Sequence, residues 1–282
     1  MGTGFEHTAL AVFTTLAPMG AGAFIALAYA FAVGKPDEEA ARRLDRWTAL
    51  PLAVLAAGFV GAFTHLASPL NAFGVFAGVG SSPLSNEVLA GVVFAALAVV
   101  YWVLALAGKL SAGARTGLLA VLSALAVVFA VFCGLAYMMY TIPTWNTPLS
   151  IVQMVGYLLA GGTVLGFCTV GCARTALPKG AGAVALALVL AGVVLGAAGF
   201  GAQIAGLEGL RNIWGSAADL VPAAGALLGA FAACGVVGGA LTYVASKRAF
   251  SPALMAAACV IVAVGIFVAR IGFYGLYMGI AL

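Results

Sequence analysis

The sequence predicts an all-α integral membrane protein, a bundle of eight transmembrane helices. Of its 282 residues, 65% are hydrophobic and only 7% are charged, whereas a soluble domain carries roughly a quarter charged residues. Eight apolar stretches are each long enough to cross a bilayer, which takes about 20 residues. The basic residues fall between these stretches in alternate connections, as in oriented membrane proteins.

The eight spans are expected within a single polytopic membrane domain, residues 1–282. They lie at about residues 10–33, 47–64, 87–107, 116–140, 151–170, 181–203, 221–245 and 253–279. Each should be helical, because backbone groups in hydrocarbon must find partners within their own segment. Glycines four residues apart, such as Gly162/Gly166 and Gly192/Gly196, are typical of close helix packing in lipid. We expect no signal peptide, since the N-terminus lacks a basic region and a cleavage site.

The distribution of basic residues predicts how the protein is oriented in the membrane. Ten of the twelve basic residues lie in the odd-numbered connections: Lys35, Arg42, Arg43, Arg46, Lys109, Arg115, Arg174, Lys179, Lys247 and Arg248. Cytoplasmic connections carry the excess of Lys and Arg. The odd connections are therefore expected in the cytoplasm, and both termini are expected to be extracytoplasmic, in the cytoplasmic (inner) membrane. The net charge of +4 serves orientation and does not indicate nucleic-acid binding.

The first connection is the only charge-rich segment. Pro36 and Asp37 are followed by two acidic residues and then by Arg42 and Arg43 at helical spacing, a pattern typical of a helix start. We interpret this segment as a solvated cytoplasmic loop that sets topology.

The extracytoplasmic connections differ, because they are apolar and carry few charges. Residues 66–84 and 141–148 have no charge at all. Exposed apolar loops are typical of interaction sites, so this face is expected to dock another subunit. Trp145 and Trp214, taken singly, are interpreted as aromatic residues at the headgroup level.

His65 and Glu87 flank the first of these uncharged segments. Ionisable groups at a membrane boundary are costly and are therefore functional candidates. A histidine that can bind a ring hydroxyl and a carboxylate that can accept a proton suit a quinol, which loses two protons with its two electrons. The alternatives are an interfacial histidine and a helix-terminal carboxylate, with Ser82-Pro83 an equally good helix start.

Arg270 lies in the extracytoplasmic half of the last span and is followed by Tyr274. An arginine there must form a pair or reach the interface; Glu87, Glu208 and a headgroup are the possible partners. Ser68, Arg270 and Tyr274 are weaker candidates for the same quinol site. No catalytic residue or metal ligand is assigned.

A haem is not expected. A membrane haem between helices usually needs two axial histidines, and the sequence has only His7 and His65. The five cysteines form no framework and are interpreted as buried thiols, so no iron–sulfur cluster is expected in this protein.

Four segments carry a family resemblance. HLASPLNAFGVFAGVGSSPLSNEVL at 65–89 resembles the H-L-G-S-P…A-F…L-S-N-E segment of the membrane anchor subunit of bacterial dimethyl sulfoxide reductase. MGTGFEHTALAVFTTLAPMGAGAF at the N-terminus, PTW at 143–145 and RIGFYGLYM at 270–278 resemble further signatures of that family, in the same order. Ala67 departs from the family, which often has Gly there.

The resemblance implies a function in anaerobic respiration. Such anchors hold an iron–sulfur electron-transfer subunit and a molybdopterin catalytic subunit on the extracytoplasmic face, and they contain no haem. They oxidise menaquinol, with a histidine and a glutamate that correspond to His65 and Glu87. The protein alone is not expected to be catalytic.

Three alternatives stand beside this interpretation. The protein could anchor a related polysulfide-, thiosulfate- or nitrite-linked complex, because the acceptor never touches the anchor. It could be a secondary transporter, although such proteins place charges at the midplane and show internal repeats. It could also be a purely structural tether, in which His65 and Glu87 do not affect electron flow.

Overall fold

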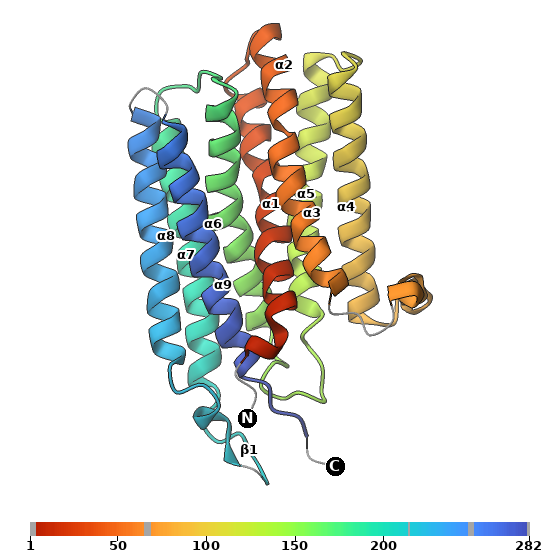
Figure 1. Cartoon of the computed structure of the whole chain (residues 1–282), viewed down its shortest axis with the longest axis vertical. Coiled ribbons are helices and arrows are strands. Elements are labelled where there is room, and N and C mark those ends of the chain that lie inside the picture. Colours follow the sequence, from red (N-terminus) through yellow and green to blue (C-terminus); the bar gives the residue numbers. More distant parts are fainter. Residues whose placement is uncertain (1–3, 65–68, 214, 248–250, 281–282) are drawn as a thin grey trace.

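A computed structural model of the protein describes residues 4–64, 69–213, 215–247 and 251–280. Within these ranges eight helices are long and apolar enough to cross a membrane, which confirms the predicted all-α integral membrane fold. Figure 1 shows the helices side by side, with their axes roughly along the long axis of the molecule.

The helices follow one another with short connections. The first span is α1 (Thr8–Ala32), which is preceded by the 3₁₀ helix η1 (Phe5–His7), and the second is formed by the consecutive helices α2 (Glu38–Trp47) and α3 (Ala49–Thr64). The other six spans are α4 (Pro83–Leu106), α5 (Ala112–Leu135), α6 (Leu149–Cys172), α7 (Ala181–Ala205), α8 (Ala224–Lys247) and α9 (Pro252–Gly275). The connections contain η2 (Pro69–Gly78), η3 (Ala217–Asp219) and a small antiparallel hairpin of β1 (Arg211–Asn212) and β2 (Gly215–Ser216).

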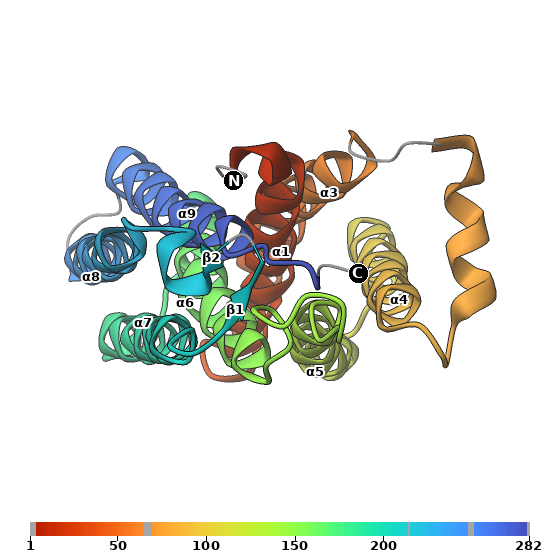
Figure 2. The same ribbon diagram turned by 90° about the horizontal axis from the view of Figure 1, so that it is seen from below.

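The bundle has two chemically different ends. We call the end at which α1 begins and α9 ends the terminal end; it also carries η2, residues 136–148 and the β-hairpin (Figure 1). The opposite end, called the basic end, carries connections 33–37, 107–111 and 173–180. Figure 2 shows η2 standing away from the bundle beyond α4. Phe73 on η2 is 83% exposed.

Helices α1 and α6 form the centre of the bundle. In each of them 78% of the most apolar stretch is buried, against 28–39% in the other six spans. The two backbones touch where Gly22 of α1 meets Gly162 of α6, because a Cβ added at Gly162 would lie 2.4 Å from the carbonyl carbon of Gly22. The predicted use of small residues for close packing is confirmed here.

Helix α4 begins at Pro83 rather than at Glu87. Ser82 is its N-cap, and its hydroxyl accepts a hydrogen bond from Ser85 N at 3.4 Å. Proline fits the first helical position, where its missing N–H would have no partner in any case. The N-terminal turn is therefore capped without Glu87, whose side chain is free to enter the bundle.

The first connection is only partly solvated. Asp37 caps α2 by accepting a hydrogen bond from Ala40 N at 2.8 Å, as the acidic start of the segment predicts. Asp45, however, is only 1% exposed, because the helix continues into the bundle. The interpretation as a solvated loop is therefore wrong for this part of α2.

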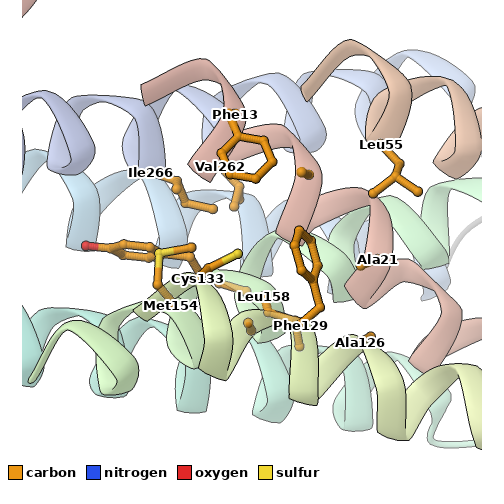
Figure 3. Close-up of a cluster of buried hydrophobic side chains, with 14 of the residues drawn as sticks. Phe13, Ala21, Leu55, Ala126, Phe129, Cys133, Met154, Leu158, Val262 and Ile266 are labelled. Atoms are coloured by element: carbon orange, nitrogen blue, oxygen red, sulfur yellow. The ribbon is translucent and has the colours of Figure 1, made fainter. Parts of the chain in front are cut away.

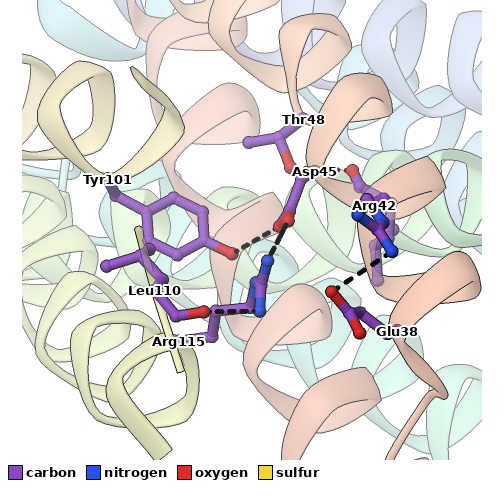
Figure 4. A network of polar contacts seen from close by, with 8 residues as sticks. Glu38, Arg42, Asp45, Thr48, Tyr101, Leu110 and Arg115 are labelled. Atoms are coloured by element: carbon purple, nitrogen blue, oxygen red, sulfur yellow. Dashed lines mark hydrogen bonds and ion pairs between the residues drawn. The ribbon is translucent and has the colours of Figure 1, made fainter. Parts of the chain in front are cut away.

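Asp45 forms a buried polar network that joins α2, α4 and α5 (Figure 4). Its carboxylate accepts hydrogen bonds from Arg115 Nε at 3.0 Å and from Tyr101 Oη at 3.4 Å, and Arg115 Nη2 lies 2.9 Å from Asp45 Oδ2. Arg115 Nη1 donates to the carbonyl of Leu110 at 2.8 Å. The buried charge of Arg115 is thus neutralised and hydrogen-bonded, as a buried ion pair requires.

Candidate functional site

The most unusual side chain of the bundle is Arg270, near the terminal end of α9. It is 0% exposed. Its Nε donates a hydrogen bond to the hydroxyl of Thr14 on α1 at 2.9 Å. The guanidinium carbon lies 4.1 Å from the ring centroid of Phe273, 4.7 Å from that of Tyr274 and 5.0 Å from that of Tyr137. These rings hold the cation by cation–π contact.

The guanidinium of Arg270 is incompletely satisfied. Nη1 and Nη2 are both buried, and neither has a hydrogen-bond partner among the described residues. The ion pairs found in the described part of the protein lie elsewhere. Among the described residues, the structure therefore shows neither an ion pair of Arg270 with Glu87 or Glu208 nor exposure of its side chain to a headgroup. An unpaired buried charge is costly, so these two nitrogens mark a place where water or a ligand completes the site.

Glu87 points into the same region from the first turns of α4. Its side chain is 4% exposed, and Oε1 has no hydrogen-bond partner in the part of the sequence that the structure describes. Two neighbouring groups affect the Glu87 carboxyl group electrostatically. They are the thiol of Cys133 on α5 and the guanidinium of Arg270. A buried carboxyl group and a buried guanidinium thus act on each other in the same part of the bundle, and no ion pair between them is found among the described residues.

Aromatic residues connect Arg270 to the surface of the terminal end. The Tyr274 hydroxyl is hydrogen-bonded to that of Tyr137 and lies 3.3 Å from that of Thr14. The ring of His7 lies 5.6 Å from that of Tyr274 and 6.1 Å from that of Tyr277. Tyr277 is 51% exposed, so the cluster reaches from the buried guanidinium to the surface.

Trp145 is a structural part of this cluster. Its indole Nε1 donates to the carbonyl of Phe273 at 2.9 Å, and the two rings are stacked with centroids 5.4 Å apart. Trp145 is buried. The prediction of a headgroup-level aromatic is therefore wrong for Trp145, because residues 136–148 fold back over the end of α9. Trp214 lies outside the described residues.

Apolar side chains pack around Cys133 of α5. Figure 3 shows Phe13 of α1, Phe129 of α5 and Ile266 of α9 packed together next to Cys133. The ring centroids of Phe13 and Phe129 are 6.3 Å apart. Close apolar packing excludes water, and electrostatic interactions are stronger where water is excluded.

A second polar cluster lies between α6, α7 and the 136–148 connection. Gln153 Nε2 donates to Gln203 Oε1 at 2.7 Å, and Gln203 Nε2 donates to the carbonyl of Thr144 at 2.8 Å. Gln153 Oε1 and the hydroxyls of Thr144, Ser150 and Tyr157 are buried without partners among the described residues. Buried polar atoms of this kind usually hold ordered water.

The structure brings together three of the predicted site residues, Glu87, Arg270 and Tyr274. His65 and Ser68 lie outside the described residues. Thr14 and Tyr137 were not predicted as site residues, and His7 was considered only as a haem ligand. Helical spacing could have indicated part of the cluster, because Thr14 follows His7, the N-cap residue of α1, by about two turns. The described residues contain no group of three His, Cys, Asp or Glu side chains placed to hold a metal ion.

Eight apolar helices that enclose a buried polar cluster near one end define a multi-pass membrane protein. The sequence profile of the family described as DMSO reductase anchor subunit (DmsC) matches residues 1–276. The protein belongs to this family, and it is a membrane anchor subunit of a DMSO reductase-type complex. Anchors of this family associate with the catalytic and electron-transfer subunits of that complex.

Individual relatives agree with this assignment. The C subunit of anaerobic dimethyl sulfoxide reductase from Escherichia coli (strain K12) is 32% identical over 294 residues, which cover 100% of this sequence and 99% of that protein. The subunit of the same description from Haemophilus influenzae is 29% identical and is matched over 60% of its length by 59% of this sequence. The YnfH subunit of anaerobic dimethyl sulfoxide reductase from E. coli is 30% identical over 62% of this sequence and 61% of its own length. No solved structure matches the protein significantly.

Proposed function

We propose that this anchor oxidises menaquinol at the Glu87–Arg270 site and passes the electrons to an iron–sulfur subunit. The observation that carries the proposal is a buried carboxyl group and a buried guanidinium, of which Glu87 Oε1 and Arg270 Nη1 and Nη2 have no hydrogen-bond partner among the described residues. A quinol offers two hydroxyl groups on an apolar ring. It therefore fits a region bounded by aromatic side chains, a cation and a carboxyl group.

Each side chain has a chemical role in this proposal. Oxidation converts the quinol to the quinone with release of two protons and two electrons. The Glu87 carboxylate accepts one hydroxyl proton. Arg270 donates hydrogen bonds to a ring oxygen and stabilises the negative charge that develops as its proton leaves. Tyr274 orients Arg270 through its ring. We propose His65 and Ser68 as hydrogen-bond partners of the second quinol hydroxyl.

The location of the site supports electron transfer at the terminal end. By the distribution of Lys and Arg, the basic end faces the cytoplasm and the terminal end is extracytoplasmic. Large apolar and aromatic side chains are exposed at the terminal end, among them Phe73, Tyr140 and Ile213. We propose this face as the docking surface of the iron–sulfur subunit, with the molybdopterin subunit beyond it.

The proposal is tested by changing Glu87→Gln in the assembled membrane complex. Quinol oxidation should fall at least about 100-fold, because a general base contributes 10²–10⁴-fold to a rate. Activity with an artificial donor that reduces the iron–sulfur subunit directly should be unchanged. Glu208→Gln is the matched control, since Glu208 is exposed at the same end. Unchanged quinol oxidation in the Glu87 variant would show that the protein is a tether or that its quinol site lies elsewhere.

The proposal also predicts the coupling of the reaction to the membrane. If protons leave at the terminal end and the acceptor is reduced on the same side, turnover moves no net charge across the bilayer. In proteoliposomes, uncoupler-sensitive generation of a membrane potential would contradict this arrangement.

A further inference from the structure

A cavity of about 840 Å³ opens at the basic end, far from the site described above. It is formed by the last turn of α6, the connection 173–180, the first turn of α7, and the facing ends of α8 and α9. Its rim carries Arg174, Lys179 and Lys247, and none of the described residues that line it is acidic. The cavity therefore concentrates positive charge.

The three cations are free to bind an external anion. None of them forms an ion pair with an acidic residue in the part of the sequence that the structure describes. Lys247 forms a cation–π contact with Tyr243, with its Nζ 5.3 Å from the ring centroid. The N-terminus of the 25-residue helix α7 also lines the cavity, and the helix dipole favours negative charge there.

A hydrogen-bonding group in the wall lacks a partner as well. Thr175 lines the cavity and is 8% exposed, and its hydroxyl has no hydrogen-bond partner among the described residues. A buried hydroxyl without a partner indicates a missing water or ligand. A phosphate oxygen is an acceptor that this hydroxyl and the three cations can share.

The rest of the lining is apolar. Phe167, Val170 and Met255 face the cavity from α6 and α9, on the side that leads into the bundle. A small anion gains nothing from contact with these apolar side chains, whereas a lipid acyl group packs favourably against them. We propose that the cavity binds the phosphate headgroup of an anionic phospholipid and that one acyl group packs on these apolar side chains.

A second cavity at the same end differs from the first in the pairing of its charges. It has a volume of about 860 Å³ and carries Lys35, Arg42 and Arg115. Arg42 lies 3.2 Å from Glu38, which also lines this cavity, and Arg115 lies 2.9 Å from Asp45. Two of its three positive charges are thus neutralised within the protein. This cavity provides a control of similar size with paired charges.

The test is lipid binding by the full-length protein, purified in a zwitterionic detergent, with phosphatidylglycerol as the probe. Thermal stabilisation on titration reports binding, and phosphatidylcholine and inorganic phosphate are titrated in parallel. Each basic side chain near a membrane surface contributes about a fivefold factor in affinity for anionic lipid. Arg174→Gln/Lys179→Gln should therefore weaken phosphatidylglycerol binding about 25-fold, while Lys35→Gln/Arg42→Gln should change it less than about twofold, because Arg42 is already paired with Glu38.

Each other outcome would overturn the proposal. Equal weakening in both double variants would show that general surface charge binds the lipid. Equal stabilisation by phosphatidylcholine would show that the headgroup is not recognised, and equal stabilisation by inorganic phosphate would indicate a free-anion site. The single variant Lys179→Gln changes an exposed residue and guards against misfolding of the double variant; it should weaken binding about fivefold.

Discussion

The change Arg270→Met distinguishes a structural from a ligand-binding role for the buried guanidinium. The variant loses one charge-assisted hydrogen bond, from Nε to Thr14 at 2.9 Å, which is worth about 1.5–3 kcal/mol. It also loses the cation–π contacts with three rings, worth about 0.5–2 kcal/mol at a single site. These losses are opposed by relief of the desolvation cost of the charge, which is several kcal/mol.

The relief of the desolvation cost should outweigh the lost interactions in the variant, because two of the three guanidinium nitrogens have no partner among the described residues. Methionine has a similar length and keeps the apolar contacts of the side chain. We expect the free energy of unfolding to stay constant or to rise by up to about 2 kcal/mol, since replacing buried charges with apolar residues is often stabilising. Thermal unfolding of the purified complex measures this change.

Quinol oxidation should fall sharply in the same variant. Removing one donor that stabilises a developing negative charge costs about 10²–10³-fold in rate, and Arg270→Met removes two unpaired donor nitrogens at once. Turnover with reduced quinol is compared with turnover from an artificial donor to the iron–sulfur subunit. The artificial donor should support wild-type rates.

The control is Thr14→Val, which takes away the Nε partner and leaves the charge in place. It should destabilise the protein by about 1.5–3 kcal/mol, the full cost of an unpaired charged donor. If Arg270→Met were instead the more destabilising change, with both activities falling together, the guanidinium would be a structural element and the reasoning above would be refuted.

Three further changes test the fold. Asp45→Asn leaves Arg115 buried and unpaired and should cost about 3–5 kcal/mol, seen as a lower unfolding temperature with unchanged quinol turnover per folded complex. Gly162→Ala places a Cβ 2.4 Å from a backbone carbon of α1 and should cost about 1–3 kcal/mol, whereas Gly117→Ala, which meets nothing within 4 Å, should stabilise α5 by up to about 1 kcal/mol. Gln203→Leu removes the oxygen that accepts the hydrogen bond of the buried Gln153 amide on α6 and should cost about 1–3 kcal/mol. An unchanged unfolding temperature would show that water accepts this hydrogen bond in the variant.

The fold was largely predictable because hydrocarbon imposes local rules. A span must be apolar over about 20 residues, and Lys and Arg gather on one side. Both rules act on short windows of sequence. Lys35, Lys109 and Lys179 therefore indicated the basic end without any knowledge of packing.

The site was predictable only in part, because its members come from distant segments. Glu87 and Arg270 stood out, since charge is rare in this sequence. Thr14 and Tyr137 are ordinary residues for a membrane helix, and only the packing of α1 against α9 and the fold of residues 136–148 bring them to Arg270. Trp145 was misinterpreted for the same reason.

Two arginines are deeply buried in the described part of the protein, and the difference between their environments supports the proposed site. Arg115 uses Nε and both Nη nitrogens within the protein, on Asp45 and on the carbonyl of Leu110. Arg270 uses Nε alone among the described residues and leaves both Nη nitrogens unpaired. An arginine that only stabilises the bundle has no reason to retain this cost, because an apolar residue of the same size would serve better. The incomplete pairing of Arg270 therefore argues that its remaining donors serve a ligand, and that stability and quinol oxidation can be changed separately.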